Sequence, residues 1–172
     1  MSTSQNGWPA LNMGSDKLHQ WVLPDGTKIV ARNGSAGFLL MHFALWFDHS
    51  IEDLREPVLD DWGYAYRPVR GYSATLSNHS SGTATDLNAT DHPLGVDHTF
   101  TAKEQAAIRK RLSFYEGCLR WGGDYQGRLD SMHFEVDKPL ADCERVARRL
   151  LTTPRGKTLL RLNPGQKAVI LS

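Results

Sequence analysis

The segment Leu76–Asn88 (LSNHSSGTATDLN) places a histidine and a carboxylate at a separation that suits a metal site. His79 and Asp86 can reach one Zn²⁺ if the chain loops between them, and small residues around Gly82 allow that close approach. A single histidine is also well explained as a surface residue or as a core residue with satisfied hydrogen bonds. This segment by itself therefore leaves both interpretations open.

A second segment, Arg128–Val136 (RLDSMHFEV), supplies Asp130 and His133. On a regular strand these two side chains would point to opposite faces, so Asp130 must lie where the chain enters the strand. Two histidines and one carboxylate leave a fourth zinc position open, which is the composition of a catalytic site rather than a structural one. A further carboxylate nearby would then serve as a general base.

The elements that must position these residues are short strands and a few helices. Thr101 followed by Glu104 predicts a capping box at the start of one helix, which Gly122 and Gly123 are expected to end. Alternation in the strand that carries His133 puts Met132, Phe134 and Val136 on its apolar face. The predicted elements are a hairpin over 21–31, helices over 37–48, 99–119 and 141–151, strand and turn over 60–70, and strands over 131–136 and 167–171.

Composition places the chain among ordinary folded proteins of one domain. It has 172 residues, of which 40% are hydrophobic and 23% charged, and no apolar run approaches the ~20 residues of a membrane helix. We expect an N-terminal arm over 1–20, a main domain over 21–151 and a C-terminal extension over 152–172 packed on it. Trp8 and Leu11 are expected to anchor the arm, and His42 to be a hydrogen-bonded core residue.

The charges are distributed unevenly along the chain. Residues 1–100 carry a net charge of −5 and residues 101–172 a net charge of +6. A basic C-terminal part could attract an anionic polymer such as a cell wall, although a solvated basic face explains it as simply. No nucleic-acid motif accompanies the basic residues, so we expect no nucleic-acid partner. Cys118 and Cys143 form neither a disulfide framework nor a metal knuckle and are expected to be thiols.

Taken together, the two segments resemble the LAS metallopeptidases. The resemblance is closest to the branch of D-alanyl-D-alanine carboxypeptidases and L-alanyl-D-glutamate endopeptidases, which includes phage endolysins, and it covers about residues 60–137. The motif residues are Ser77, His79, Gly82, Ala84 and Asp86, then DSMHFE over 130–135, with the connecting pieces RPVRGY over 67–72 and WGGDY over 121–125.

The resemblance implies a zinc peptidase and assigns its residues. It implies an α+β fold in which a small, mainly antiparallel sheet carries the zinc site and packs against helices. Several relatives have glutamate where this chain has Asp130, and phage-type members resemble it in using aspartate. The implied roles are zinc ligands His79, Asp86 and His133, general base Asp130, and substrate binding by Arg70 in preference to Arg67, with Ser77 in the wall. Glu135 shares a strand face with His133, which favours a partner that orients the imidazole over a second base.

The implied activity is hydrolysis of an amide bond in the peptidoglycan stem peptide by zinc-bound water. Cleavage between L-alanine and D-glutamate is favoured, and the alternatives are a D-alanyl-D-alanine carboxypeptidase and a non-catalytic zinc-stabilised binding domain. The first seven residues lack the features of a secretory signal, so we expect a monomeric phage-type lysin that stays in the host cytoplasm until lysis. We expect no membrane partner, and His92 and His98 are expected to be surface residues.

Overall fold

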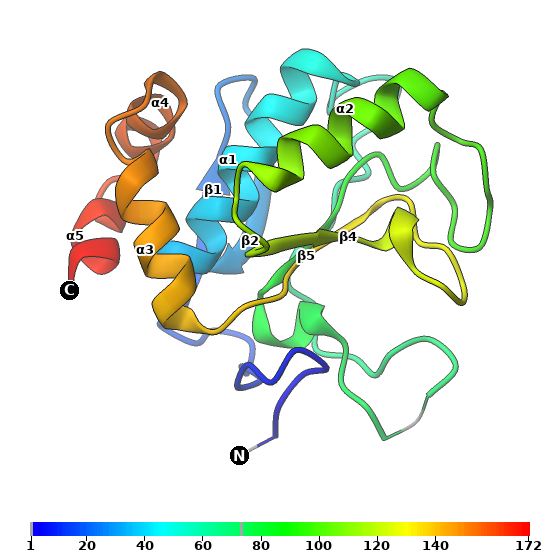
Figure 1. Cartoon of the computed structure of the whole chain (residues 1–172). Coiled ribbons are helices and arrows are strands. Elements are labelled where there is room, and N and C mark those ends of the chain that lie inside the picture. Colours follow the sequence, from blue (N-terminus) through cyan, green and yellow to red (C-terminus); the bar gives the residue numbers. More distant parts are fainter. Residues whose placement is uncertain (1, 73) are drawn as a thin grey trace.

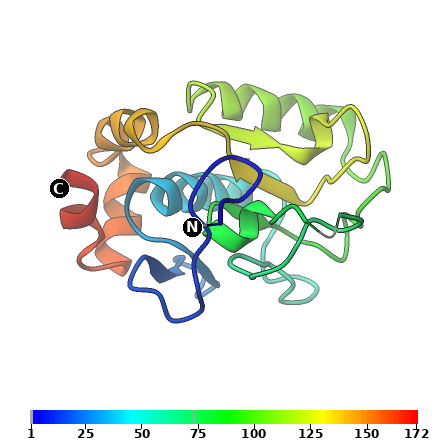
Figure 2. The same ribbon diagram turned by 90° about the horizontal axis from the view of Figure 1, so that it is seen from below.

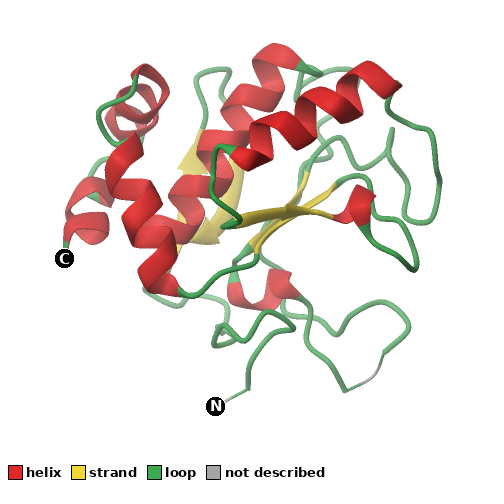
Figure 3. Ribbon diagram, in the orientation of Figure 1, coloured by secondary structure: helices red, strands yellow, loops and turns green. Residues whose placement is uncertain are grey.

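The computed structural model describes residues 2–72 and 74–172, which form an α+β fold (Figure 1). A two-stranded sheet and a three-stranded sheet, both antiparallel, pack against helices, as Figure 3 shows by colour. The predicted fold class is therefore confirmed. The longer helices gather at one side of the molecule, and loops with two short 3₁₀ helices surround the three-stranded sheet at the other (Figures 1 and 2).

Helix α1 (Gly34–Ser50) forms the centre of the core. Most of its residues are buried on every side, which explains why this segment is apolar almost throughout rather than amphipathic. It contacts α3 (Leu140–Leu150), α4 (Pro154–Leu162) and α5 (Gln166–Leu171). No helix in the described part of the chain is long and apolar enough to cross a membrane.

The predicted hairpin is confirmed as β1 (Leu18–Val22) and β2 (Lys28–Arg32). Gly26 has a φ of 94°, which a residue with a side chain rarely adopts, and the Thr27 amide donates to Asp25 Oδ1 over 3.0 Å. The segment before the hairpin is held to the domain by Trp8 and Leu11, both of which are buried as expected.

The second sheet has the strand order β3 (Ala84–Asp86), β5 (His133–Val136) and β4 (Leu119–Trp121). In its register Asp86 lies opposite His133, and Trp121 lies opposite Phe134. Phe134 faces the core, where its ring centroid is 4.6 Å from that of Phe43 on α1. The opposite face of β5 is thereby left for His133 and Glu135.

The helix predicted over 99–119 is shorter in the structure. Helix α2 (Ala102–Ser113) begins with the expected capping box of Thr101 and Glu104. It ends at Ser113, because Glu116 and Gly117 have positive φ angles that turn the chain into β4. Gly122 and Gly123 therefore do not end this helix, and the prediction was wrong there.

The strand predicted over 167–171 was also wrong, because this segment forms helix α5. It buries Ile170 in the core, and the Gln166 side chain accepts a hydrogen bond from the Gly34 amide at 2.8 Å. Residues 60–70 are extended but form only isolated bridges, at Trp62 with Asp86 and at Pro68 with Leu76. Helix α3 occupies nearly the segment predicted over 141–151.

Candidate metal centre

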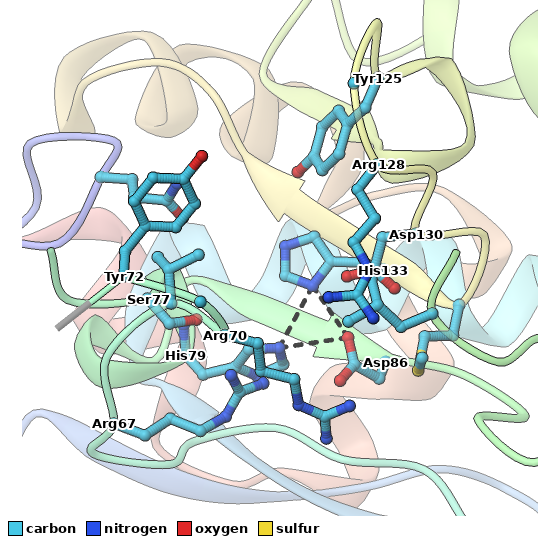
Figure 4. Close-up of a pocket in the computed structure, with 16 residues that line it drawn as sticks. Arg67, Arg70, Tyr72, Ser77, His79, Asp86, Tyr125, Arg128, Asp130 and His133 are labelled. Carbon is cyan, nitrogen blue, oxygen red and sulfur yellow. Dashed lines mark hydrogen bonds and ion pairs between the residues drawn. The ribbon is translucent and has the colours of Figure 1, made fainter.

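Three side chains from two sequence segments meet at the edge of the three-stranded sheet. His79 lies in the 3₁₀ helix η1 (Asn78–Ser81), Asp86 ends β3 and His133 begins β5. His79 Nε2 is 3.1 Å from Asp86 Oδ1 and 3.2 Å from His133 Nδ1, and His133 Nδ1 is 2.8 Å from Asp86 Oδ1. Figure 4 shows the three side chains pointing toward one another.

The local backbone explains why these residues converge. Asp86 and His133 are cross-strand neighbours, so the antiparallel register alone brings their side chains together. His79 reaches them because Gly82, with a φ of 68°, turns the chain back from η1 into β3. A Cβ atom at Gly82 would lie 2.7 Å from the Arg32 amide nitrogen, so a larger residue does not fit this turn.

The hydrogen bonds of the two histidines direct the inner ring nitrogen of each toward the same point. His79 Nδ1 lies 2.5 Å from the Gly63 carbonyl oxygen, and His133 Nε2 lies 3.0 Å from Glu135 Oε2. Both acceptors hold a ring proton on the outer nitrogen, so His79 Nε2 and, once it has released its own proton, His133 Nδ1 face the centre as lone-pair donors. With Asp86 Oδ1 they form three electron-pair donors around a common centre.

This donor set fits zinc. A tetrahedral ion with bonds of ~2.0–2.1 Å needs donor atoms about 3.3 Å apart, close to the three separations observed here. Two imidazoles and one carboxylate form a three-ligand set with a further position open to the cavity. The structure therefore supports a buried metal site formed by His79, Asp86 and His133.

Glu135 is the charged residue behind His133. Its carboxylate accepts hydrogen bonds from Arg120 Nε at 2.8 Å, from the Tyr125 hydroxyl at 2.7 Å and from the Asn78 amide. Burial would raise the pKa of Glu135, but hydrogen bonds from His133, Tyr125 and Arg120 hold that pKa well below its usual range. Glu135 is therefore a permanent negative charge beside His133.

The two carboxylates also determine the protonation of His133. Burial would lower the pKa of His133, but its hydrogen bonds to Asp86 and Glu135 outweigh this and raise the pKa to about 10. Asp86 keeps its pKa below the usual carboxyl range despite burial, because His79 and His133 stabilise its negative charge. The site thus attracts positive charge, either a proton or a metal ion.

Asp130 lies in the loop that leads into β5 and lines the same cavity. Its backbone is held by a hydrogen bond from its amide to Gly122 O at 3.0 Å, and a Cβ atom at Gly122 would lie 2.4 Å from Asp130 O. Among the described residues its Oδ1 atom is buried without a hydrogen-bond partner. Burial raises the pKa of Asp130 above its ordinary value. The charge of Asp86 raises this pKa further, and the nearby His133 and His79 oppose the rise without cancelling it.

Two adjoining cavities, of about 530 and 400 Å³, meet at His79 and Asp86. Arg67 and Arg70 line both cavities, and Ser77 and Arg128 line the first. Figure 4 shows Arg67 and Arg70 on one side of the point where His79, Asp86 and His133 meet, with Asp130 and Arg128 on the other. The groove thus presents positive side chains on both sides of the metal site.

The structure brings every sequence-predicted site residue to this groove except Glu135, which lies behind His133. Sequence reasoning did not single out Arg128, nor the Glu135 partners Asn78, Arg120 and Tyr125. Tyr125 ends the WGGDY piece, so the motif itself contained a signal for it. Nothing in the sequence pattern distinguishes Arg120 or Arg128 from other basic residues.

The sequence also led to predictions for three histidines outside the metal centre. His42 is buried and hydrogen-bonded to the Tyr115 hydroxyl over 2.9 Å, as expected. His98 is exposed, also as expected. His92 was predicted at the surface, and this was wrong: it is buried, stacks on Phe100 and lies 2.7 Å from Glu52 Oε2.

A comparison with protein families gives one match. A peptidase family model described as D-alanyl-D-alanine carboxypeptidase matches residues 70–136. This segment contains the whole His-Asp-His group. It also contains Arg70, Asp130 and Glu135 but not Arg67, and it spans less than half of the chain. No curated protein and no solved structure gives a significant match. The family match supports a zinc peptidase that acts on peptidoglycan in general terms.

Proposed function

We propose that this protein is a peptidoglycan peptidase of the phage endolysin type that cleaves the stem peptide between L-alanine and D-glutamate. The observation that carries the proposal is the convergence of three ligand atoms within 4.8 Å of one another in a cavity that Asp130 also lines. An aspartate at the position of the base, where several carboxypeptidases have glutamate, favours the endolysin type.

The residues of this chain divide the chemistry among them. Zinc, when held by the two imidazoles and the carboxylate, would supply Lewis acidity for the scissile carbonyl and for a water nucleophile. Asp130 accepts the proton of the attacking water, whose oxygen bonds to the carbonyl carbon. It then donates that proton to the leaving amine as the C–N bond breaks. Burial raises the pKa of Asp130 above its ordinary value, which helps this carboxyl group hold the proton between the two steps.

The shape and charge of the groove support an endopeptidase. The two cavities extend to either side of His79 and Asp86, so a peptide chain has space on both sides of the scissile bond. Arg70 borders both cavities and Arg128 the first, and both are exposed. We assign to them the carboxylates of the stem peptide, with Arg70 also placed to stabilise the negative charge on the carbonyl oxygen.

Mass spectrometry of peptidoglycan fragments tests this proposal. Wild type, Asp130→Asn and a chelator-treated sample are incubated with purified fragments, and Asp124→Asn, an exposed aspartate of the nearby 3₁₀ helix, serves as the matched control. We expect wild type and the control to separate L-alanine from D-glutamate. Asp130→Asn should lose about 10²–10⁴-fold in rate while it keeps its metal.

The other outcomes identify the alternatives. Release of one terminal alanine by the wild type would favour the D-alanyl-D-alanine carboxypeptidase, the activity named by the family match. Intact fragments in every sample, on several wall types, would contradict a hydrolase and favour a zinc-stabilised binding domain.

A further inference from the structure

A separate cavity lies on the helical side of the molecule, away from the metal centre. It has a volume of about 470 Å³ and lies between α1, the end of α2 and the start of α4, on the side where α4 stands in Figure 1. We call it the arginine pocket. The lining residues that bear on ligand binding are His42, His49, Arg111, Phe114, Arg155 and Thr158.

The two arginines of this pocket have no carboxylate partner within the described part of the chain. This distinguishes them from Arg120, which pairs with Glu135, and from Arg145 and Arg149, which pair with Glu116. Among residues 2–72 and 74–172, the Nε atoms of Arg111 and Arg155 are also buried without an acceptor. Buried donors that lack acceptors are costly, so both guanidinium groups gain from an added acceptor.

The other contacts of Arg111 leave its charge uncompensated. Its guanidinium lies 4.6 Å from the ring centroid of Phe114, and its Nη2 atom is 3.4 Å from the Tyr115 hydroxyl. These contacts hold the guanidinium in place but supply no negative charge. Burial lowers the pKa of Arg155, and the positive charge of Arg111 lowers it further.

The histidines of the pocket add no negative charge either. Burial, together with the charges of Arg111 and Arg155, lowers the pKa of His42 to about 3, so its ring is neutral at neutral pH. His49 is largely exposed and lies 3.8 Å from Asp48 Oδ2. The Asp48 carboxylate accepts the Leu54 amide at 3.1 Å and does not line the pocket. The cavity is therefore a concave, positively charged site.

We propose that the arginine pocket binds a phosphate group between the guanidinium groups of Arg111 and Arg155. Guanidinium forks match the oxygens of a phosphate, and two positive charges match the charge that a phosphate monoester carries near neutral pH. The hydroxyl of Thr158 offers a further hydrogen-bond donor at the wall. The cavity has room for a small organic group as well, so the ligand is inorganic phosphate or a small phosphoester.

Isothermal titration calorimetry at constant ionic strength, with sodium chloride as the balancing salt, tests this site. Inorganic phosphate and glycerol 3-phosphate are each titrated into wild type, Arg155→Gln and Arg161→Gln. Arg161 lies on the same helix, is exposed and does not line the pocket, so its variant has the same charge change away from the site. We expect saturable binding to wild type and Arg161→Gln, weakened about tenfold or more in Arg155→Gln.

Thr158→Glu gives a second test that adds a carboxylate to the pocket instead of removing a cation. It should block phosphate binding while the protein remains folded, and phosphate should then no longer raise its melting temperature as it does for wild type. Tighter binding of glycerol 3-phosphate than of inorganic phosphate would identify a phosphoester as the ligand, and the reverse would identify the free ion. No saturable binding to wild type, equal loss in Arg155→Gln and Arg161→Gln, or undiminished binding to Thr158→Glu would overturn the proposal.

Discussion

His133 in the metal centre and His42 in the arginine pocket are both buried, yet their surroundings have opposite charges. Asp86 and Glu135 outweigh the effect of burial and raise the pKa of His133 to about 10. Burial and the charges of two arginines lower the pKa of His42 to about 3. Burial alone would disfavour the charged form of both rings, so the neighbouring charges decide the difference. One cavity consequently suits a cation and the other an anion.

Removing the negative charge beside His133 should have the largest effect on this contrast. Glu135→Gln keeps the size of the side chain but removes the charge that polarises His133. We expect its zinc affinity to fall about 10–100-fold, measured by competition with a chromophoric chelator. Asp137→Asn is the matched control, because Asp137 also contacts Arg120 but is partly exposed and has no contact with His133. Equal affinity of Glu135→Gln and wild type would show that Glu135 does not set the cation preference.

The pH dependence of metal binding should reveal the proton that His133 holds. The pKa of His133 is raised above its unfolded value, so the metal-free protein keeps this proton at neutral pH and metal must displace it. Zinc affinity should therefore rise by about tenfold per pH unit between roughly pH 6 and 8. Calorimetry in buffers of different ionisation enthalpy would count the released protons. A pH-independent affinity with no proton release would contradict the charge assignment.

His42 should produce a smaller effect, seen in stability, because its pKa is shifted in the opposite direction from that of His133. Its folded pKa lies below the unfolded value, so the unfolded chain binds more protons and the free energy of unfolding falls as pH decreases from about 6.5. From pH 6 to 4, wild type should lose about 1 kcal/mol per pH unit more than His42→Gln in urea denaturation. His49→Gln, an exposed position on the same helix, should follow wild type. Parallel pH profiles for all three proteins would mean that His42 does not titrate in this way.

Local signals predicted much of the fold. The Pro-Asp-Gly turn predicted the hairpin, and Thr101 with Glu104 predicted the start of α2, because the interactions that form these features lie within a few residues. The chain turns at Glu116 and Gly117 after α2 and enters β4, where Leu119 pairs with Val136, a residue distant in sequence. Helix α5 likewise depends on contacts of Ile170 and Gln166 with other parts of the chain.

The motifs also predicted which residues could form the metal site, since histidines and aspartates at these spacings limit the candidates. The motifs gave little information on the contributions of Asn78, Arg120 and Arg128 to the site. These residues lie on separate elements that only the fold brings together. His92 shows the same limit: Glu52 and Phe100 lie far from it in sequence but enclose it in the fold.

The amino-acid sequence by itself determined the ligand types, the capped helix and the glycines that allow tight turns, because these depend on residue chemistry and near neighbours. Only the tertiary structure decided that Asp86 faces His133 and that Arg111 and Arg155 share one cavity without a carboxylate. The physical reason is that electrostatic interactions depend on separation in space and on burial. Neither can be obtained from the separation of two residues along the chain.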